Sequence, residues 1–206
     1  NLVFDMHSEY GWPSRAETGY DLAGLKQMFG SRVSVFSLDE RSSIRRGLTP
    51  DYVARIGFDE IEPEDIAILA GAMNITDLGV QACYSLRRVL GGDWVSKLLA
   101  LSANDIKDRA EEFGSNPNTL DALRYRLRQL ERLDFMSVRS LSGGGTVKQV
   151  LDHLEDGRHV VFEFGRYGDD LTAYLLVANL ITRRIHAEYR DRTERALASD
   201  GKEPSP

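Results

Sequence analysis

Three short apolar runs lie along the chain, at Leu2–Phe4, at Val33–Phe36, which only Ser34 interrupts, and at Val160–Phe162. Such runs are typical of parallel strands that are buried on both faces. Between the first two runs, residues 21–29 have a helical period, and Gly30 can end that helix. The order strand, helix, strand with short connections predicts an α/β fold with a parallel sheet. The apolar positions of the predicted helix are Leu22, Leu25, Met28 and Phe29.

From about Pro63 to Leu133 the apolar spacing is helical throughout. Pro63 can begin a helix at its first turn, and Ser102 with Asp105 has the spacing of an N-terminal cap for a helix that Gly114 would end. This stretch predicts a helical subdomain inserted into the α/β body. Its two apolar stripes are Leu78, Ala82, Leu86, Val89 and Leu90, and Leu120, Leu123, Leu127, Leu130 and Leu133.

After a glycine-rich return at Ser142–Gly145, the strand-and-helix pattern resumes. Thr146 and Gln149 have capping-box spacing, and Asp156–Gly157 predicts a turn before the third apolar run. A long helix is predicted from Leu171 to about Tyr189. Its apolar face is expected to contain Tyr174, Ala178, Ile181 and Ile185.

These patterns divide the chain into four expected parts. Residues 1–60 form the first part of the α/β core, 61–135 the inserted helical subdomain, and 136–195 the return to the core with its strand and long helix. Residues 196–206 are polar with glycine and proline, and we expect a flexible linker there.

Composition limits the partners and the compartment. The net charge of −6 argues against coating nucleic acid by bulk basicity, although a local patch could still bind DNA. The most apolar stretch, Leu175–Ile181, is too short to cross a bilayer, so no membrane is expected as a partner. The single cysteine, Cys83, indicates a reducing cytoplasm. The first residues read as a buried strand without an initiator methionine, and we expect a fragment.

Two of the predicted strands end in a carboxylate, at Asp5 and Glu163. Ligands of open α/β sheets bind outside the carboxyl ends of the strands. An acid there can hold Mg²⁺ through water or orient a water molecule against a phosphate. The alternative is an acid that only caps the turn after its strand.

The loop after the first strand carries Asp5, His7 and Glu9 in alternation, which an extended backbone would place on one side. An Asp-x-His sequence after a strand also occurs in binuclear metallophosphoesterases. That class needs further histidines in later loops. The remaining histidines, at positions 153, 159 and 186, fall in predicted helices or at a strand start, so the sequence lacks the ligand setting that this class requires.

The sequence Asp5-Met-His-Ser-Glu-Tyr10 resembles the Asp-x-His-Gly-Glu-Tyr motif of the HerA branch of the HerA/FtsK ATPases. Residue types match at Asp5, His7, Glu9 and Tyr10, whereas Ser8 replaces the usual glycine. The layout is also similar to that family. A strand, an inserted helical bundle, a strand ending in an acid, and a long helix leading to the Walker B strand follow in that order.

The resemblance implies part of the parallel sheet of a RecA-like P-loop NTPase that uses ATP and Mg²⁺. It implies a homohexameric ring that moves double-stranded DNA, acting in DNA end processing and repair with a NurA-type nuclease. Asp5 would be catalytic, lying beside the γ-phosphate and binding Mg²⁺ through water, with Glu9 supporting the same loop. The implied nucleotide-binding positions are His7, Ser8 and Glu163.

The chain lacks other parts of that machinery. No Gly-x-x-x-x-Gly-Lys-[Ser/Thr] occurs in the sequence, and Gly143–Lys148 has the wrong spacing for it. The Walker B strand and the arginine finger are missing as well. The resemblance therefore implies an interior fragment that does not hydrolyse ATP alone. Two alternatives stay open: a DNA-pumping or conjugation ATPase of the same superfamily, and a non-catalytic interaction module.

Overall fold

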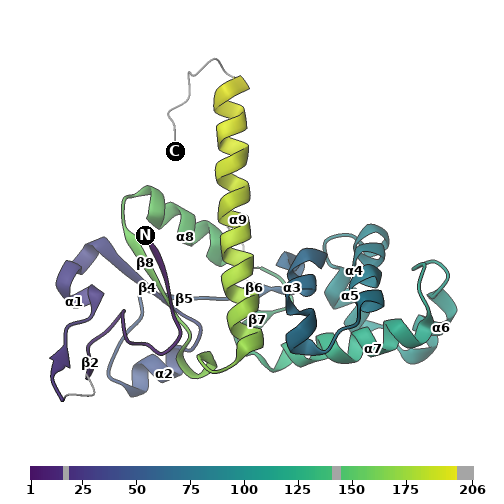
Figure 1. Ribbon diagram of the computed structural model, residues 1–206, viewed down its shortest axis with the longest axis horizontal. Helices are drawn as coiled ribbons and strands as arrows, with labels where there is room; N and C mark the ends of the chain where they lie inside the picture. Colours follow the sequence, from purple (N-terminus) through teal and green to yellow (C-terminus); the bar gives the residue numbers. More distant parts are fainter. Residues whose placement is uncertain (16–18, 141–144, 199–206) are drawn as a thin grey trace. The chain divides into compact units, whose positions relative to one another are not determined.

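The computed structural model describes residues 1–15, 19–140 and 145–198. The chain forms two compact units. The first contains Asn1–Val53, Thr146–Gly168 and the chain from Val177 onward. The second contains Ala54–Gly145 and Asp169–Leu176. Figure 1 shows the first unit as a sheet with helices and the second as a group of helices.

The first unit is built on a parallel sheet with the strand order β1-β8-β4-β5. The strands are β1 (Leu2–Asp5), β8 (His159–Glu163), β4 (Val33–Ser37) and β5 (Tyr52–Val53). The three predicted strands are confirmed as parallel neighbours, with β8 between β1 and β4. The strand β5 was not predicted, because it has only two residues.

Both faces of this sheet are covered, as its continuous apolar strands require. On one face, Val33, Val35 and Val161 form a core with Trp12, against which Leu25 packs. On the other face, the ring of Phe36 stacks on Tyr52 at 4.7 Å and on Phe162 at 6.0 Å between centroids. The ring of His153 from helix α8 (Gly145–Glu155) meets the edges of Phe36 and Tyr52, so α8 covers this second face.

The helix predicted over residues 21–29 is shorter than expected. Asp21–Leu22 form a strand, β3, that pairs antiparallel with β2 (Ser14–Arg15), and α1 spans only Leu25–Phe29. A side chain at Gly24 would come within 2.3 Å of the Trp12 backbone, so the chain needs glycine at this approach. Gly30 ends α1 as predicted. The predicted apolar stripe is wrong, because Leu22, Met28 and Phe29 are exposed. A 3₁₀ turn (Gly30–Arg32) leads into β4, and α2 (Glu40–Arg45) follows it.

The second unit is helical, with one small parallel sheet. Its helices are α3 (Pro63–Met73), α4 (Asp77–Leu90), α5 (Trp94–Ala100), α6 (Ala103–Arg109) and α7 (Pro117–Leu127), with 3₁₀ turns at Phe58–Glu60 and Arg128–Arg132. The sheet pairs β6 (Ile56–Gly57) with β7 (Met136–Ser137). Pro63 lies in the first turn of α3, and the capping box of Ser102 and Asp105 is confirmed.

The leucine stripe of α7 and the turn after it is buried at all five predicted positions, so this prediction is confirmed. The stripe on α4 is confirmed only in part. Ala82, Leu86 and Leu90 are buried, but Leu78 is exposed and Val89 is half-buried. The helix begun at Ser102 ends at Arg109, and turns rather than helix lead to Gly114.

The helices that flank β8 differ from expectation in their details. α8 begins at Gly145, so Thr146 lies inside the helix; residues 142–144 of the predicted return lie outside the described residues. The turn at Asp156–Gly157 is confirmed.

α9 spans Leu171–Ala198 and so extends past Tyr189 into the expected linker. Residues 199–206 of that linker lie outside the described residues. The predicted face of α9 is confirmed only in part, because Ile181 is buried whereas Tyr174, Ala178 and Ile185 are half-buried. The buried positions are Ala173, Leu176, Val177, Leu180 and Ile181.

Within the part of the chain that the structure describes, no helix is long and apolar enough to cross a membrane.

Candidate functional site

The carboxyl ends of three parallel strands meet at one edge of the main sheet. Asp5 of β1 pairs in register with Glu163 of β8, and Glu163 pairs with Ser37 of β4. Asp39 follows β4 two residues later. Three acidic residues therefore gather at the edge where open α/β sheets bind their ligands. The two acids predicted from the sequence, Asp5 and Glu163, are brought together as neighbours.

Asp5 holds the loop that follows β1. Its side chain is only 1% exposed. One carboxylate oxygen accepts the backbone N–H of Glu9 at 2.9 Å, and the other accepts those of Tyr10 and Gly11 at 2.9 and 3.0 Å. Hydrogen bonds of this kind to a charged acceptor are stronger than neutral ones and satisfy a buried carboxylate. The shape of the loop therefore depends on the Asp5 carboxylate.

The loop is bent, so the expected alternation of Asp5, His7 and Glu9 on one side of an extended chain is wrong. Ser8 has a φ of +58°, in the left-handed region that glycine adopts at least cost. This conformation explains why glycine suits the position that Ser8 occupies in the motif. The bend buries Asp5 and leaves His7, Glu9 and Tyr10 exposed.

Glu163 connects β8 to α2. Its carboxylate is fully buried, accepts a hydrogen bond from the Ser43 hydroxyl at 3.0 Å, and forms an ion pair with the Arg46 guanidinium. Its backbone carbonyl accepts the N–H of Leu38 at 3.0 Å. A buried carboxylate needs such partners to stay ionised. Glu163 thus fixes the position of α2 behind the sheet edge.

Asp39 connects α2 to the loop after β8. As the N-cap of α2 it accepts the Ser42 N–H at 3.1 Å, and its other oxygen accepts the Arg166 N–H at 3.4 Å. The Arg166 guanidinium Nε lies 3.8 Å from the same oxygen. Sequence reasoning missed Asp39, although an Asp after an apolar strand and before a Ser-rich stretch is itself a signal for an N-cap.

Two glycines let the loops at this edge approach each other closely. A side chain on Gly165, whose φ is +57°, would come within 2.7 Å of the Asp39 Cβ. One on Gly168 would come within 2.1 Å of the Met6 carbonyl oxygen in the loop that Asp5 holds. The Phe164 N–H also donates to the Asp5 carbonyl oxygen at 3.2 Å. The loops after β1, β4 and β8 are therefore packed into one assembly.

The fit of this edge to Mg²⁺ can be judged from the donor atoms. Among residues 1–15, 19–140 and 145–198, no group of three His, Cys, Asp or Glu side chains is placed to hold a metal ion. Both oxygens of Asp5 are occupied by backbone N–H groups and buried. Asp5 therefore does not fit a direct metal ligand in this conformation, whereas the sequence led us to expect Mg²⁺ bound to Asp5 through water.

A family model, that of the central domain of helicase HerA, matches residues 1–185. Together with the parallel sheet and its opening motif, this match places the chain in that family. Membership indicates an ATPase of the HerA/FtsK type, and hence nucleotide use by the intact protein. Comparison with curated proteins and with solved structures gave no significant match.

Proposed function

We propose that the chain supplies the carboxyl-edge loops of the ATP site in a hexameric translocase or helicase of double-stranded DNA, which acts in DNA end processing and repair with a NurA-type nuclease. The observation that carries the proposal is the loop of the motif itself. A buried acid, Asp5, holds three backbone N–H groups and so presents His7 and Glu9 to solvent at the ligand-binding edge of the sheet.

Each residue has a proposed part in that site. Asp5 is the residue that positions the loop, and its catalytic importance comes through the groups it places. Glu9 carries the exposed carboxylate that orients the attacking water, as an acid does in phosphoryl transfer. His7 and Ser8 contact the nucleotide. Glu163 keeps α2 in place at the same edge through Ser43 and Arg46.

ATP and Mg²⁺ are the cofactors of the intact protein in this proposal. Mg²⁺ binds readily to the phosphates of a nucleotide, where it neutralises the charge that develops on the transferred group. The remaining components are the phosphate-binding loop and the Walker B acid, which do not occur in the printed sequence. The nucleotide would therefore bind jointly to this edge and to those components.

The ring, the DNA and the nuclease are proposed on the family resemblance. With a net charge of −6, the chain would have to contact DNA through a local surface of the ring. A DNA-pumping or conjugation ATPase of the same superfamily would use this edge in the same way. A non-catalytic interaction module would not use this edge for ATP. In such a module, a change in the shape of the loop would leave ATP hydrolysis unchanged.

The test is the hydrolysis of ATP by the natural full-length protein, with and without duplex DNA. We expect Glu9→Gln to lower kcat about 100-fold or more while nucleotide still binds, since loss of a positioned catalytic acid or base costs this much. Glu194→Gln is the matched control, because Glu194 is an exposed acid on α9. Normal turnover by Glu9→Gln would contradict the proposed role.

The same assay on Asp5→Ala separates a catalytic loop from a structural one. We expect DNA-stimulated hydrolysis to be abolished, because three loop N–H groups lose their acceptor. Light scattering should show that the ring still assembles. Asp5→Asn keeps the size of the side chain and should give an intermediate rate. Wild-type turnover in both variants would remove Asp5 from the mechanism and favour an interaction module.

A further inference from the structure

Arg166 lies in the turn that follows β8, a 3₁₀ helix at Gly165–Tyr167. Its guanidinium donates to the Tyr167 hydroxyl at 2.7 Å, lies over the Tyr167 ring at 4.9 Å from the centroid, and approaches Asp39 at 3.8 Å. The Tyr167 side chain is buried, and so is Asp39. These two buried groups fix the direction of a side chain that is itself 46% exposed.

The place of Arg166 in the fold puts it beside the motif loop. Gly168, two residues further on, packs against the Met6 carbonyl, and Phe164, two residues before, donates to the Asp5 carbonyl. Arg166 is therefore in a segment held against the loop that carries His7 and Glu9. Both segments extend from the carboxyl ends of neighbouring parallel strands.

Two arginines at this edge differ in how firmly their ion pairs hold them. Arg46 pairs with Glu163, a fully buried carboxylate, and moving Arg46 would leave that buried charge with only the Ser43 hydroxyl as its partner. Arg166 is paired with Asp39 at the longer distance of 3.8 Å, and Asp39 keeps the Ser42 N–H as a donor in any case. A long, half-exposed ion pair adds little stability, so an anion at this edge can compete with Asp39 for the Arg166 guanidinium while the contact with Tyr167 is kept.

We propose that Arg166 contacts the terminal phosphate of the nucleotide bound at this edge, with Asp39 and Tyr167 as its positioning residues. This inference rests on the proposed function. A guanidinium suits the task because it is always charged and presents paired N–H donors to phosphate oxygens. Arg166 stays protonated while the water oxygen bonds to the terminal phosphorus and the water gives a proton to the Glu9 carboxylate that orients it. The bond to the bridging oxygen breaks, and its electron pair leaves with ADP. The positive charge of Arg166 stabilises the negative charge on the transferred group.

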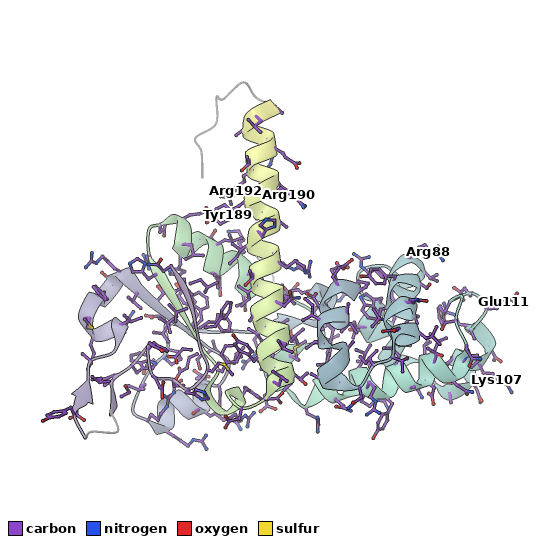
Figure 2. All side chains as sticks on the ribbon, viewed as in Figure 1. Arg88, Lys107, Glu111, Tyr189, Arg190 and Arg192 are labelled. Carbon is purple, nitrogen blue, oxygen red and sulfur yellow. The ribbon has the colours of Figure 1, made fainter. Side chains whose placement is uncertain are left out.

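The experiment compares Arg166→Ala, Arg166→Lys and Asp39→Asn in the natural full-length protein. Arg190→Ala is the control, because Arg190 is an exposed arginine on α9 (Figure 2). The measured quantities are kcat for ATP, the affinity for ADP, and the affinity for ADP with aluminium fluoride, which resembles the transferred phosphoryl group. Thermal unfolding of each variant reports on the fold.

We expect Arg166→Ala to lower kcat about 100-fold and to lose tight binding of ADP with aluminium fluoride, as removal of a donor to a developing charge does. The affinity for ADP alone should change less than about 3-fold, since ADP lacks the contacted group. Arg166→Lys should restore part of the rate. The kcat of Asp39→Asn should lie between that of the wild-type protein and that of Arg166→Ala.

Equal rates for Arg166→Ala and Arg190→Ala would overturn the inference. If Arg166→Ala lost affinity equally for ADP and for ADP with aluminium fluoride, the inference would also be overturned, because Arg166 would then only support the fold of the site. A wild-type protein that hydrolyses no ATP would instead refute the proposed function, so the two failures are distinguishable.

Discussion

The acids at the sheet edge have different surroundings, and those surroundings separate their roles. Asp5 is surrounded by backbone N–H groups, Glu163 by a hydroxyl and a guanidinium, and Asp39 by a helix N-terminus and the Arg166 N–H. All three are buried and compensated. Glu9, by contrast, is exposed. The buried acids fix the geometry of the loops, and in the proposed function the chemistry on a bound phosphate belongs to exposed groups such as Glu9.

Ser8 provides a test of the strained loop. Because its φ is +58°, we expect Ser8→Gly to raise the free energy of unfolding by about 0.5 kcal/mol, after the entropy that glycine loses on folding is deducted. The matched control is Ser85→Gly in the middle of α4, where the same change should lower it by about 0.5 kcal/mol. Chemical denaturation of each variant measures both. Destabilisation by Ser8→Gly would show that the loop does not need a left-handed residue.

His153 predicts how stability depends on pH. Burial, and then the positive charge of Arg158, lower the pKa of His153 below its usual 6.5, while its ring bonds to the Ser34 hydroxyl at 3.0 Å. The unfolded chain therefore binds a proton more readily than the folded one. The contribution of His153 to stability should be full above pH 6.5 and should fall as the pH drops below it.

The urea midpoint, measured between pH 7.5 and 5, should depend less steeply on pH in His153→Gln than in the wild-type protein. Exposed His186 gives the control, His186→Gln; an unchanged slope in His153→Gln would contradict the assignment.

The elements that the sequence predicted are those with a strong apolar period. The strands β4 and β8 and the leucine stripe of α7 are of this kind, and their burial follows from pattern alone. The strand β1 was predicted as well, but its apolar residues Leu2, Val3 and Phe4 are only half-buried. The two-residue strands were not predictable, because two residues are too few to show a period, and some of these strands also depend on a partner far along the chain. β6, for example, pairs with β7 about 80 residues later, through Ile56 and Met136.

The candidate site was predictable only at its two strand ends. Asp5 and Glu163 follow apolar runs, so a rule about parallel sheets finds them. The contacts that give them their roles come from elsewhere in the chain. Arg46 and Glu163 are 117 residues apart, and Arg166 and Asp39 are 127 apart. The bend at Ser8 is a backbone choice that residue type alone disfavours, so the alternation argument failed there.

Helix α7 offers a prediction at the scale of the element. Leu123 is 2% exposed, and Leu123→Ala should lower the free energy of unfolding of the second unit by about 3 kcal/mol through lost burial and a cavity. The same substitution at Leu78, which is 64% exposed on α4, should change it by less than about 0.5 kcal/mol. Hydrogen exchange of amides in α3–α7 measures the effect. Similar costs at the two positions would contradict the packing described for α7.

At the scale of the whole molecule, the chain combines a parallel sheet bearing the motif loop with a separate helical unit. The family match spans both units, since it covers residues 1–185. α9 begins in the residues counted with the second unit and continues in the first, as one helix of 28 residues (Figure 1).

The most direct test of this account is ATP-driven movement along DNA by the natural full-length protein. A third strand annealed to a duplex as a triplex is displaced by a protein that translocates along that duplex. We predict displacement that requires ATP, that continues with Glu194→Gln, and that is lost with Glu9→Gln. Displacement by Glu9→Gln at the wild-type rate, or ATP hydrolysis by the wild-type protein without any displacement, would contradict the account.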